Sequence, residues 1–152
     1  MTTIAYDGKV LVVDRQVTYQ AIGYKCDKLF ATPLGLAAIG GSANSAMAII
    51  RWLCETDRNI IEYPVMSKDD NASVVIVAPD KHLILYDSDS STPLELPCQM
   101  YVEGSGGHIA YGAMLAGKNA VAAMQIAIKA DINSGNGYSV GNVVKGTIKH
   151  YD

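Results

Sequence analysis

The chain has 152 residues, of which 49% are hydrophobic and 18% are charged, a balance typical of a folded globular protein. Twelve Lys and Arg against fifteen Asp and Glu give a net charge of −3, which argues against a basic surface for nucleic acid. No apolar run approaches the ~20 residues of a membrane-spanning helix. We therefore expect one domain over residues 1–152, with neither nucleic acid nor a membrane as partner.

The start of the chain and its cysteines indicate a cellular compartment. The first residues lack the basic segment of a secretory leader and include an acid, Asp7. Cys26, Cys54 and Cys98 are odd in number, widely spaced and without a CxxC pair. These features predict a reduced chain in the cytoplasm.

The first forty residues are rich in β-forming side chains separated by turn signals. Asp7-Gly8 is a strong hairpin signal, and Pro33-Leu34-Gly35 predicts a second hairpin. Another turn is expected at Gly23. The strands expected in this region cover residues 2–6, 9–13, 16–22, 28–32 and 36–39.

Helical spacing begins after Gly40-Gly41. Ser42 or Asn44 can cap a helix over residues 43–55. Two more helices are expected, from His108 to about residue 115 and from Asn119 to about Asp131, the second with an Ala-rich face. The other expected elements are a loop or short helix over 57–71, a hairpin of strands 73–78 and 82–86, an exposed loop over 87–97 leading to a short strand, and one or two closing strands over 138–150. Segregated strands and helices predict an α+β fold with antiparallel sheet and helices packed on it.

Common catalytic motifs are missing from the sequence. His82, His108 and His150 are isolated and form no HExxH motif, so the sequence predicts no metal site. The segment GSGG at 104–107 is not a nucleophile elbow, because Glu103 rather than Gly stands two residues before Ser105. It also lacks the Lys of a phosphate-binding loop, and a strand-to-helix turn accounts for it.

The amino terminus offers another chemistry. Met1 precedes the small residue Thr2, so we expect Met1 to be trimmed during maturation. An α-amine titrates near ~7.7–8.0, whereas lysine titrates near ~10.4. The freed amine of Thr2 could therefore accept the proton of its own hydroxyl. Taken alone, these residues are better explained as the start of an ordinary β-strand.

Six motifs, found in order along the chain, favour the catalytic interpretation over the ordinary strand. They are Thr2-Thr3-Ile4, the run from Asp7 to Thr18, Lys28-Leu29-Phe30, Gly40-Gly41-Ser42-Ala43-Asn44, Gly104-Ser105-Gly106-Gly107 and Asp131-Ile132-Asn133-Ser134. Together they resemble proteasome β subunits and HslV-type peptidases, which are N-terminal-nucleophile (Ntn) threonine hydrolases. The resemblance implies a four-layer αββα sandwich with antiparallel sheets, no cofactor, and assembly into homo-oligomeric rings.

The resemblance assigns roles to the matching residues. Thr2 is implied to be the nucleophile and, through its amine, the base. Lys28 matches the family's active-site lysine, which would lower the pKa of that amine by like-charge repulsion. Asp14 would hold Lys28 in place. The alternative is that Asp14 and Lys28 form a structural ion pair between strands with no catalytic role. Lys25 is a rival for the lysine role, and Arg15 stands where it could compete for Asp14.

The remaining roles concern the amine and the substrate. Ser105, Asp131 and Ser134 match groups that would orient the amine by hydrogen bonds. Gly40 matches the backbone N–H donor to the oxyanion. The substrate contacts implied are Thr18, whose backbone would pair with an extended peptide, and Ala38, a small wall of the specificity pocket.

The leading hypothesis is a threonine peptidase subunit of a self-compartmentalising ring. Its substrates would be peptides or unfolded proteins, and an ATP-dependent unfoldase is the implied partner. One alternative is a non-catalytic structural subunit with the same fold, which the presence of Arg15 favours. A second is an Ntn amidase acting on small amides without a ring.

Overall fold

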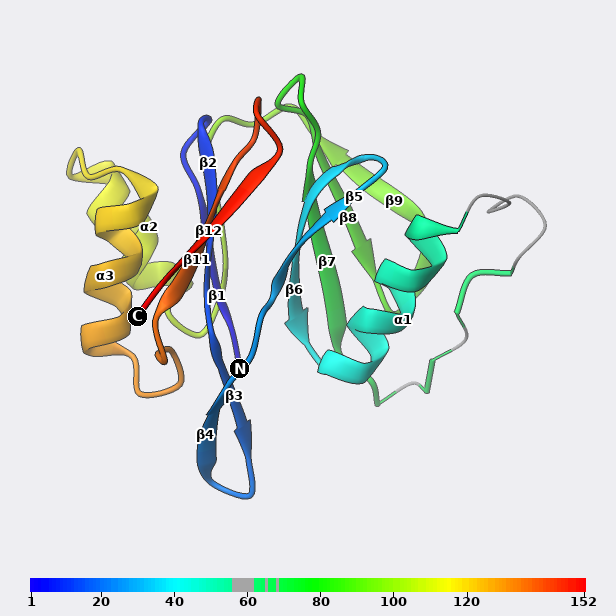
Figure 1. The fold of residues 1–152 in the computed structure, drawn as a ribbon, viewed down its shortest axis with the longest axis horizontal. Coiled ribbons are helices and arrows are strands. Elements are labelled where there is room, and N and C mark those ends of the chain that lie inside the picture. Colours follow the sequence, from blue (N-terminus) through cyan, green and yellow to red (C-terminus); the bar gives the residue numbers. More distant parts are fainter. Residues whose placement is uncertain (56–61, 65, 68) are drawn as a thin grey trace.

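The computed structural model describes residues 1–55, 62–64, 66–67 and 69–152 (Figure 1). Short strands dominate this part of the chain, and three helices interrupt them. In chain order the elements are β1 (Thr3–Tyr6), β2 (Val10–Asp14), β3 (Gln16–Tyr19), β4 (Ile22–Lys25), β5 (Leu29–Thr32), β6 (Gly35–Gly41), α1 (Ala43–Cys54), β7 (Ala72–Val77), β8 (Leu83–Asp87), β9 (Ser90–Leu96), β10 (Tyr101–Gly104), α2 (Gly107–Leu115), α3 (Ala120–Ala130), β11 (Tyr138–Asn142) and β12 (Thr147–Tyr151).

Two sheets stack face to face and carry helices on their outer sides. One sheet has the strand order β10-β1-β2-β11-β12 and the other β5-β6-β7-β8-β9, and every strand pairing is antiparallel. Helices α2 and α3 cover the first sheet, and α1 covers the second (Figure 1). The predicted α+β fold with four αββα layers is therefore confirmed.

Alternation along the strands builds three layers of core. On β1, Ile4 lies between the sheets while Ala5 faces α2 and α3. On β6, Ala38 lies between the sheets while Ile39 faces α1. Fully burying one aliphatic side chain is worth roughly 1.5–3 kcal/mol. The stacked layers thus hold the strand ends that carry the candidate site in fixed positions.

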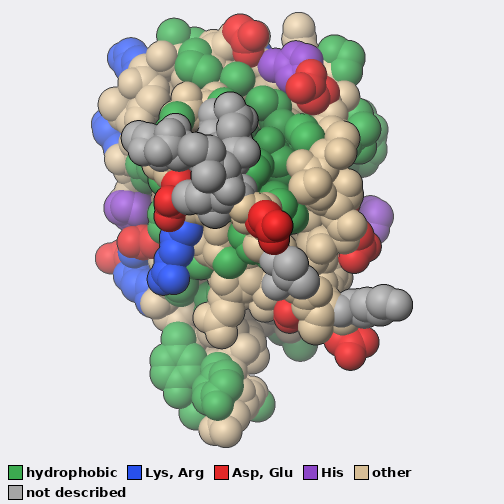
Figure 2. Space-filling view, turned by 90° about the vertical axis from the view of Figure 1, so that its right-hand side faces the viewer, with side chains coloured by type: hydrophobic (Ala, Val, Ile, Leu, Met, Phe, Trp, Pro, Cys, Tyr) green, Lys and Arg blue, Asp and Glu red, His purple; other side chains and the backbone are tan. Residues whose placement is uncertain are grey.

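A two-stranded hairpin of β3 and β4 projects from the sandwich (Figure 1). Figure 2 shows hydrophobic side chains gathered on this projection. Tyr19, Ile22 and Tyr24 are each at least half exposed there. The predicted turn at Gly23 is wrong, because the turn is formed by Gln20 and Ala21 with φ of 48° and 64°. A two-residue hairpin turn of type I′ needs positive φ at both central positions, and these two residues supply it.

Residues 87–97 also differ from their prediction as an exposed loop. Most of them form β9, which pairs with β8 at the edge of its sheet. Pro93 lies within this strand, and an edge strand tolerates proline because its outer N–H groups need no partner strand. The polar composition of the segment therefore reflects an exposed edge.

The interval 57–71 was expected to be a loop or short helix. Residues 57–61, 65 and 68 lie outside the described part of the chain, and the described residues of this interval form neither helix nor strand. Of the helices that the structure describes, none is long and apolar enough to cross a membrane.

Candidate active site

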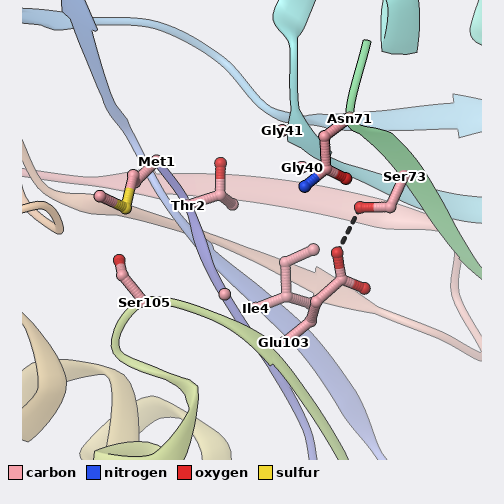
Figure 3. A pocket seen from close by; sticks show the side chains of 10 residues that line it. Met1, Thr2, Ile4, Gly40, Gly41, Asn71, Ser73, Glu103 and Ser105 are labelled. Atoms are coloured by element: carbon pink, nitrogen blue, oxygen red, sulfur yellow. Dashed lines mark hydrogen bonds between the residues drawn. The ribbon is translucent and has the colours of Figure 1, made fainter. Parts of the chain in front are cut away.

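Thr2 lies at one end of the space between the two sheets, directly before β1. It is 6% exposed and, like Met1, lines two cavities. One cavity, of about 330 Å³, is also lined by Gly40, Glu103 and Ser105 (Figure 3). The other, of about 210 Å³, is also lined by Thr18, Lys28 and Gly40. A chain bound at Thr2 could thus place side chains in both cavities.

The Lys28 ammonium is the central charged group of the site. Its Nζ donates to Asp14 Oδ1 at 2.9 Å, to the Thr2 hydroxyl oxygen at 3.2 Å and to the Met1 carbonyl at 3.0 Å. Lys28 and Asp14 are both fully buried. Burial lowers the pKa of Lys28, and the adjacent Asp14 carboxylate opposes that shift. The protein thereby holds a cation against the hydroxyl of residue 2 and the group bonded to its nitrogen.

Backbone donors fix the position of Asp14. Its Oδ1 accepts the Thr3 N–H at 2.8 Å, and its Oδ2 accepts the N–H groups of Gln16 at 3.0 Å and Gly135 at 3.3 Å. These donors come from the start of β1, the start of β3 and the loop after α3. Asp14 therefore ties three segments together while it pairs with Lys28.

The two rival basic residues point elsewhere. Arg15 donates to Asp27 Oδ1 from Nη2 at 2.8 Å and from Nε at 3.1 Å, so it does not pair with Asp14. Lys25 is exposed and donates to Asp152. Of the two lysines considered, only Lys28 contacts Thr2.

Ser105, Asp131 and Ser134 form one hydrogen-bonded cluster beside residue 2. Both serine hydroxyls donate to Asp131 Oδ2 at 2.6 Å. The backbone N–H of Ser105 donates to the Thr2 carbonyl at 3.0 Å, which ties the cluster to residue 2. Burial acts to raise the pKa of Asp131, but the serine donors and Asn133 outweigh it, and the net shift is downward. The cluster thus keeps an anion close to the start of the chain.

Of the three residues expected at the oxyanion and substrate positions, two line the cavities and one does not. Gly40 lines both cavities, and a Cβ there would lie 2.6 Å from Ser73 Oγ, so the position has no room for a side chain unless Ser73 moves. Thr18 on β3 lines the smaller cavity. Ala38 is fully buried between the sheets, and its role as a pocket wall stays a prediction.

A second polar group, not predicted from the sequence, lies at the site. Glu103 accepts hydrogen bonds from Ser73 and Tyr101 and lines the larger cavity with Thr2. The sequence contains a signal for this group. Ser73 and Glu103 are polar, yet they occupy strand positions where the alternating pattern predicts an inward-facing apolar side chain. In the described part of the chain, no three His, Cys, Asp or Glu side chains gather to form a metal site.

Comparison with known proteins bears on the fold. No protein-family model matches the sequence, and no curated protein matches it. The structure is similar to the crystal structure of eukaryotic HslV from Trypanosoma brucei, with a TM-score of 0.67 and 20% identity over 99% of this chain and 100% of that chain. At this identity the likeness concerns the fold. The chain has the Ntn-hydrolase fold of HslV.

Proposed function

We propose that the chain is a threonine peptidase subunit that cleaves peptide bonds through Thr2 after Met1 is removed. The observation that carries this proposal is the buried contact of Lys28 Nζ with both Thr2 Oγ1, at 3.2 Å, and Asp14 Oδ1, at 2.9 Å. A lysine that served only as a structural ion pair with Asp14 would not need to touch the hydroxyl of residue 2.

These contacts support the following reaction. The α-amine of Thr2 accepts the hydroxyl proton as Oγ attacks the carbonyl carbon of the substrate. The oxyanion that forms is stabilised by the N–H of Gly40. The C–N bond then breaks, the amine's proton passes to the leaving nitrogen, and an ester remains on Thr2. Water, deprotonated by the same amine, hydrolyses the ester and restores the enzyme.

Lys28 makes the amine a suitable base. Its Nζ already contacts the carbonyl of Met1, the group bonded to the Thr2 nitrogen, so it lies close to where the free amine would be. A neighbouring cation lowers the pKa of an amine, which starts near ~7.7–8.0, and keeps more of it unprotonated at neutral pH. The same charge favours the developing alkoxide on Thr2.

The family resemblance supports a wider setting for this activity. We propose homo-oligomeric rings in the cytoplasm that degrade peptides or unfolded proteins and receive substrate from an ATP-dependent unfoldase. Enclosure in a ring would exclude folded proteins from the site. Sedimentation analysis tests the assembly, and a monomer at micromolar concentration would contradict it.

The test of the activity combines mass, labelling and variants. Intact mass shows whether Met1 is lost, and a β-lactone electrophile should then add once to Thr2. Thr2→Ala and Lys28→Ala should each abolish peptide cleavage and leave assembly intact. Lys25→Ala is the matched control, because Lys25 is exposed and contacts Asp152 instead, and it should cleave normally.

The outcome also separates the alternatives. Retained Met1 with no adduct on Thr2 in assembled protein would favour the structural subunit. Arg15 no longer favours the structural subunit, because it binds Asp27 and leaves the Asp14–Lys28 pair intact. An adduct together with turnover of small amides alone would indicate the amidase.

A further inference from the structure

The space between the sheets is apolar over most of its length and polar at the end where Thr2 lies. Along β7 the inward positions hold Val75 and then Ser73. Along β10 they hold Tyr101 and then Glu103. Because alternate residues of a strand share a face, Ser73 and Glu103 meet across the gap between the two sheets. Figure 3 shows their side chains pointing toward each other.

Neutral hydroxyl groups hold the Glu103 carboxylate. Ser73 donates to Oε1, and the Tyr101 hydroxyl donates to Oε2 at 2.7 Å. Burial raises the pKa of Tyr101, and the charge of Glu103 raises it further, so the phenol stays a donor at neutral pH. No Lys, Arg or His among the described residues forms an ion pair with Glu103. Within the described part of the chain, a half-buried carboxylate is therefore fixed in position without a compensating cation.

This carboxylate lines the larger cavity beside the nucleophile. Thr2 and Ser105 border the same cavity, and Glu103 Oε1 lies 3.0 Å from where a Cβ on Gly40 would be. The smaller cavity is lined by Thr18, the residue whose backbone is expected to pair with an extended peptide substrate. When the part of the substrate before the cleaved bond pairs with Thr18, the residue after that bond lies in the cavity of Glu103.

Building on the peptidase function proposed above, we infer that Glu103 selects lysine or arginine as the first residue after the cleaved bond. Each carboxylate oxygen accepts one hydroxyl and keeps a lone pair for a cationic donor. A charge-assisted hydrogen bond in a partly desolvated site is among the stronger protein contacts. An aliphatic side chain of the same length would leave the carboxylate unpaired, and an acidic one would be repelled. The expected preference for lysine over norleucine is on the order of tenfold.

Cleavage-site sequencing tests this selection directly. The assembled protein digests a reduced, unfolded protein substrate, and mass spectrometry identifies the residue that follows each cleaved bond. Lysine and arginine should be enriched about tenfold with the unmodified protein. The isosteric Glu103→Gln variant keeps both hydroxyl neighbours and should lose the enrichment. Glu95→Gln is the matched control and should keep the enrichment. Glu95 is exposed on the edge strand β9 and pairs with His82.

A binding measurement separates this inference from the peptidase proposal. Calorimetry on Thr2→Ala compares a lysine-containing peptide with its norleucine analogue, and then repeats both on Thr2→Ala combined with Glu103→Gln. Tighter binding of the lysine peptide, lost with Glu103→Gln, supports the inference even if no cleavage or Thr2 adduct is found, an outcome that contradicts only the peptidase. Equal binding of the two peptides, or cleavage without enrichment, overturns the role of Glu103 and leaves the peptidase standing.

Discussion

The buried Lys28–Asp14 pair predicts an unequal loss of stability when either partner is replaced. In Lys28→Met the carboxylate of Asp14 keeps three backbone N–H donors, from residues 3, 16 and 135. In Asp14→Asn the ammonium of Lys28 loses its counter-charge inside the protein. The new amide NH₂ also faces at least one of the N–H donors that the carboxylate satisfied. Asp14→Asn should therefore be the more destabilising change.

The distance between the charges sets the scale. At 2.9 Å from Nζ to Oδ1, with an effective dielectric constant of ~20, the Coulomb attraction is about 6 kcal/mol. Desolvation of both groups opposes most of it, whereas losing one partner of a buried pair typically costs ~3–5 kcal/mol. We expect a loss of about 3 kcal/mol in the free energy of unfolding for Lys28→Met and about 5 kcal/mol for Asp14→Asn.

Urea unfolding of both variants and of the double variant measures these losses. Unchanged m-values would show that the same two states are compared. The double variant should lose less than the two single losses together, because the second change no longer leaves a charge unpaired. A smaller loss for Asp14→Asn than for Lys28→Met, or losses that add fully, would refute this account of the pair.

Two further changes test the surroundings of residue 2. At Gly104, where φ is +90°, a Cβ would lie 1.7 Å from the Thr2 carbonyl oxygen, so Gly104→Ala should cost about 3 kcal/mol from backbone strain and overpacking. Gly117→Ala, at a φ of +89° with open space around it, isolates the strain and should cost about 1 kcal/mol; equal drops in Tm would show that the crowding is absent. Ser105→Ala removes a donor from Asp131 and should raise the pKa of that carboxyl, followed by carbon NMR. Because folding lowers the pKa of Asp131, this carboxylate stabilises the folded protein above ~pH 4, and that stabilisation is lost as the pH falls through the folded pKa. Ser105→Ala should therefore lose less stability over this pH range than the unmodified protein. An unchanged pKa of Asp131 in the variant would contradict the hydrogen-bond assignment.

Local signals predicted the elements that local chemistry controls. Asp7 accepts the N–H groups of Lys9 and Val10, and this fixes the first hairpin where Asp7-Gly8 predicted it. The helix expected from Asn119 begins there, with the side chain of Asn119 capping Ala122 N–H. The turn of the β3–β4 hairpin could not be found this way, because strand pairing imposed positive φ on residues without a preference for it.

The candidate site was predictable only where a linear motif carried it. Thr2, Lys28 and Asp14 stand at separate strand ends, yet each belongs to a short segment that resembles a known family. Glu103 and Ser73 belong to no such segment, and they meet only because two sheets pack face to face. The sequence shows that each residue is polar at an inward position, whereas their pairing depends on how the sheets are stacked.

The hydroxyl of Thr3 has a different fate from that of Thr2, although the two residues are chemically identical. Thr3 Oγ1 lies 2.6 Å from Ser134 Oγ and accepts the Gly106 N–H at 2.8 Å, on the side of the sheet away from the cavities. Its N–H is bound to Asp14. Trimming one residue too far would thus create a new terminal threonine whose oxygen is already engaged and faces the wrong way. Under the proposed chemistry, maturation must be accurate to a single peptide bond. A subunit trimmed at the wrong bond would fold but would be inactive.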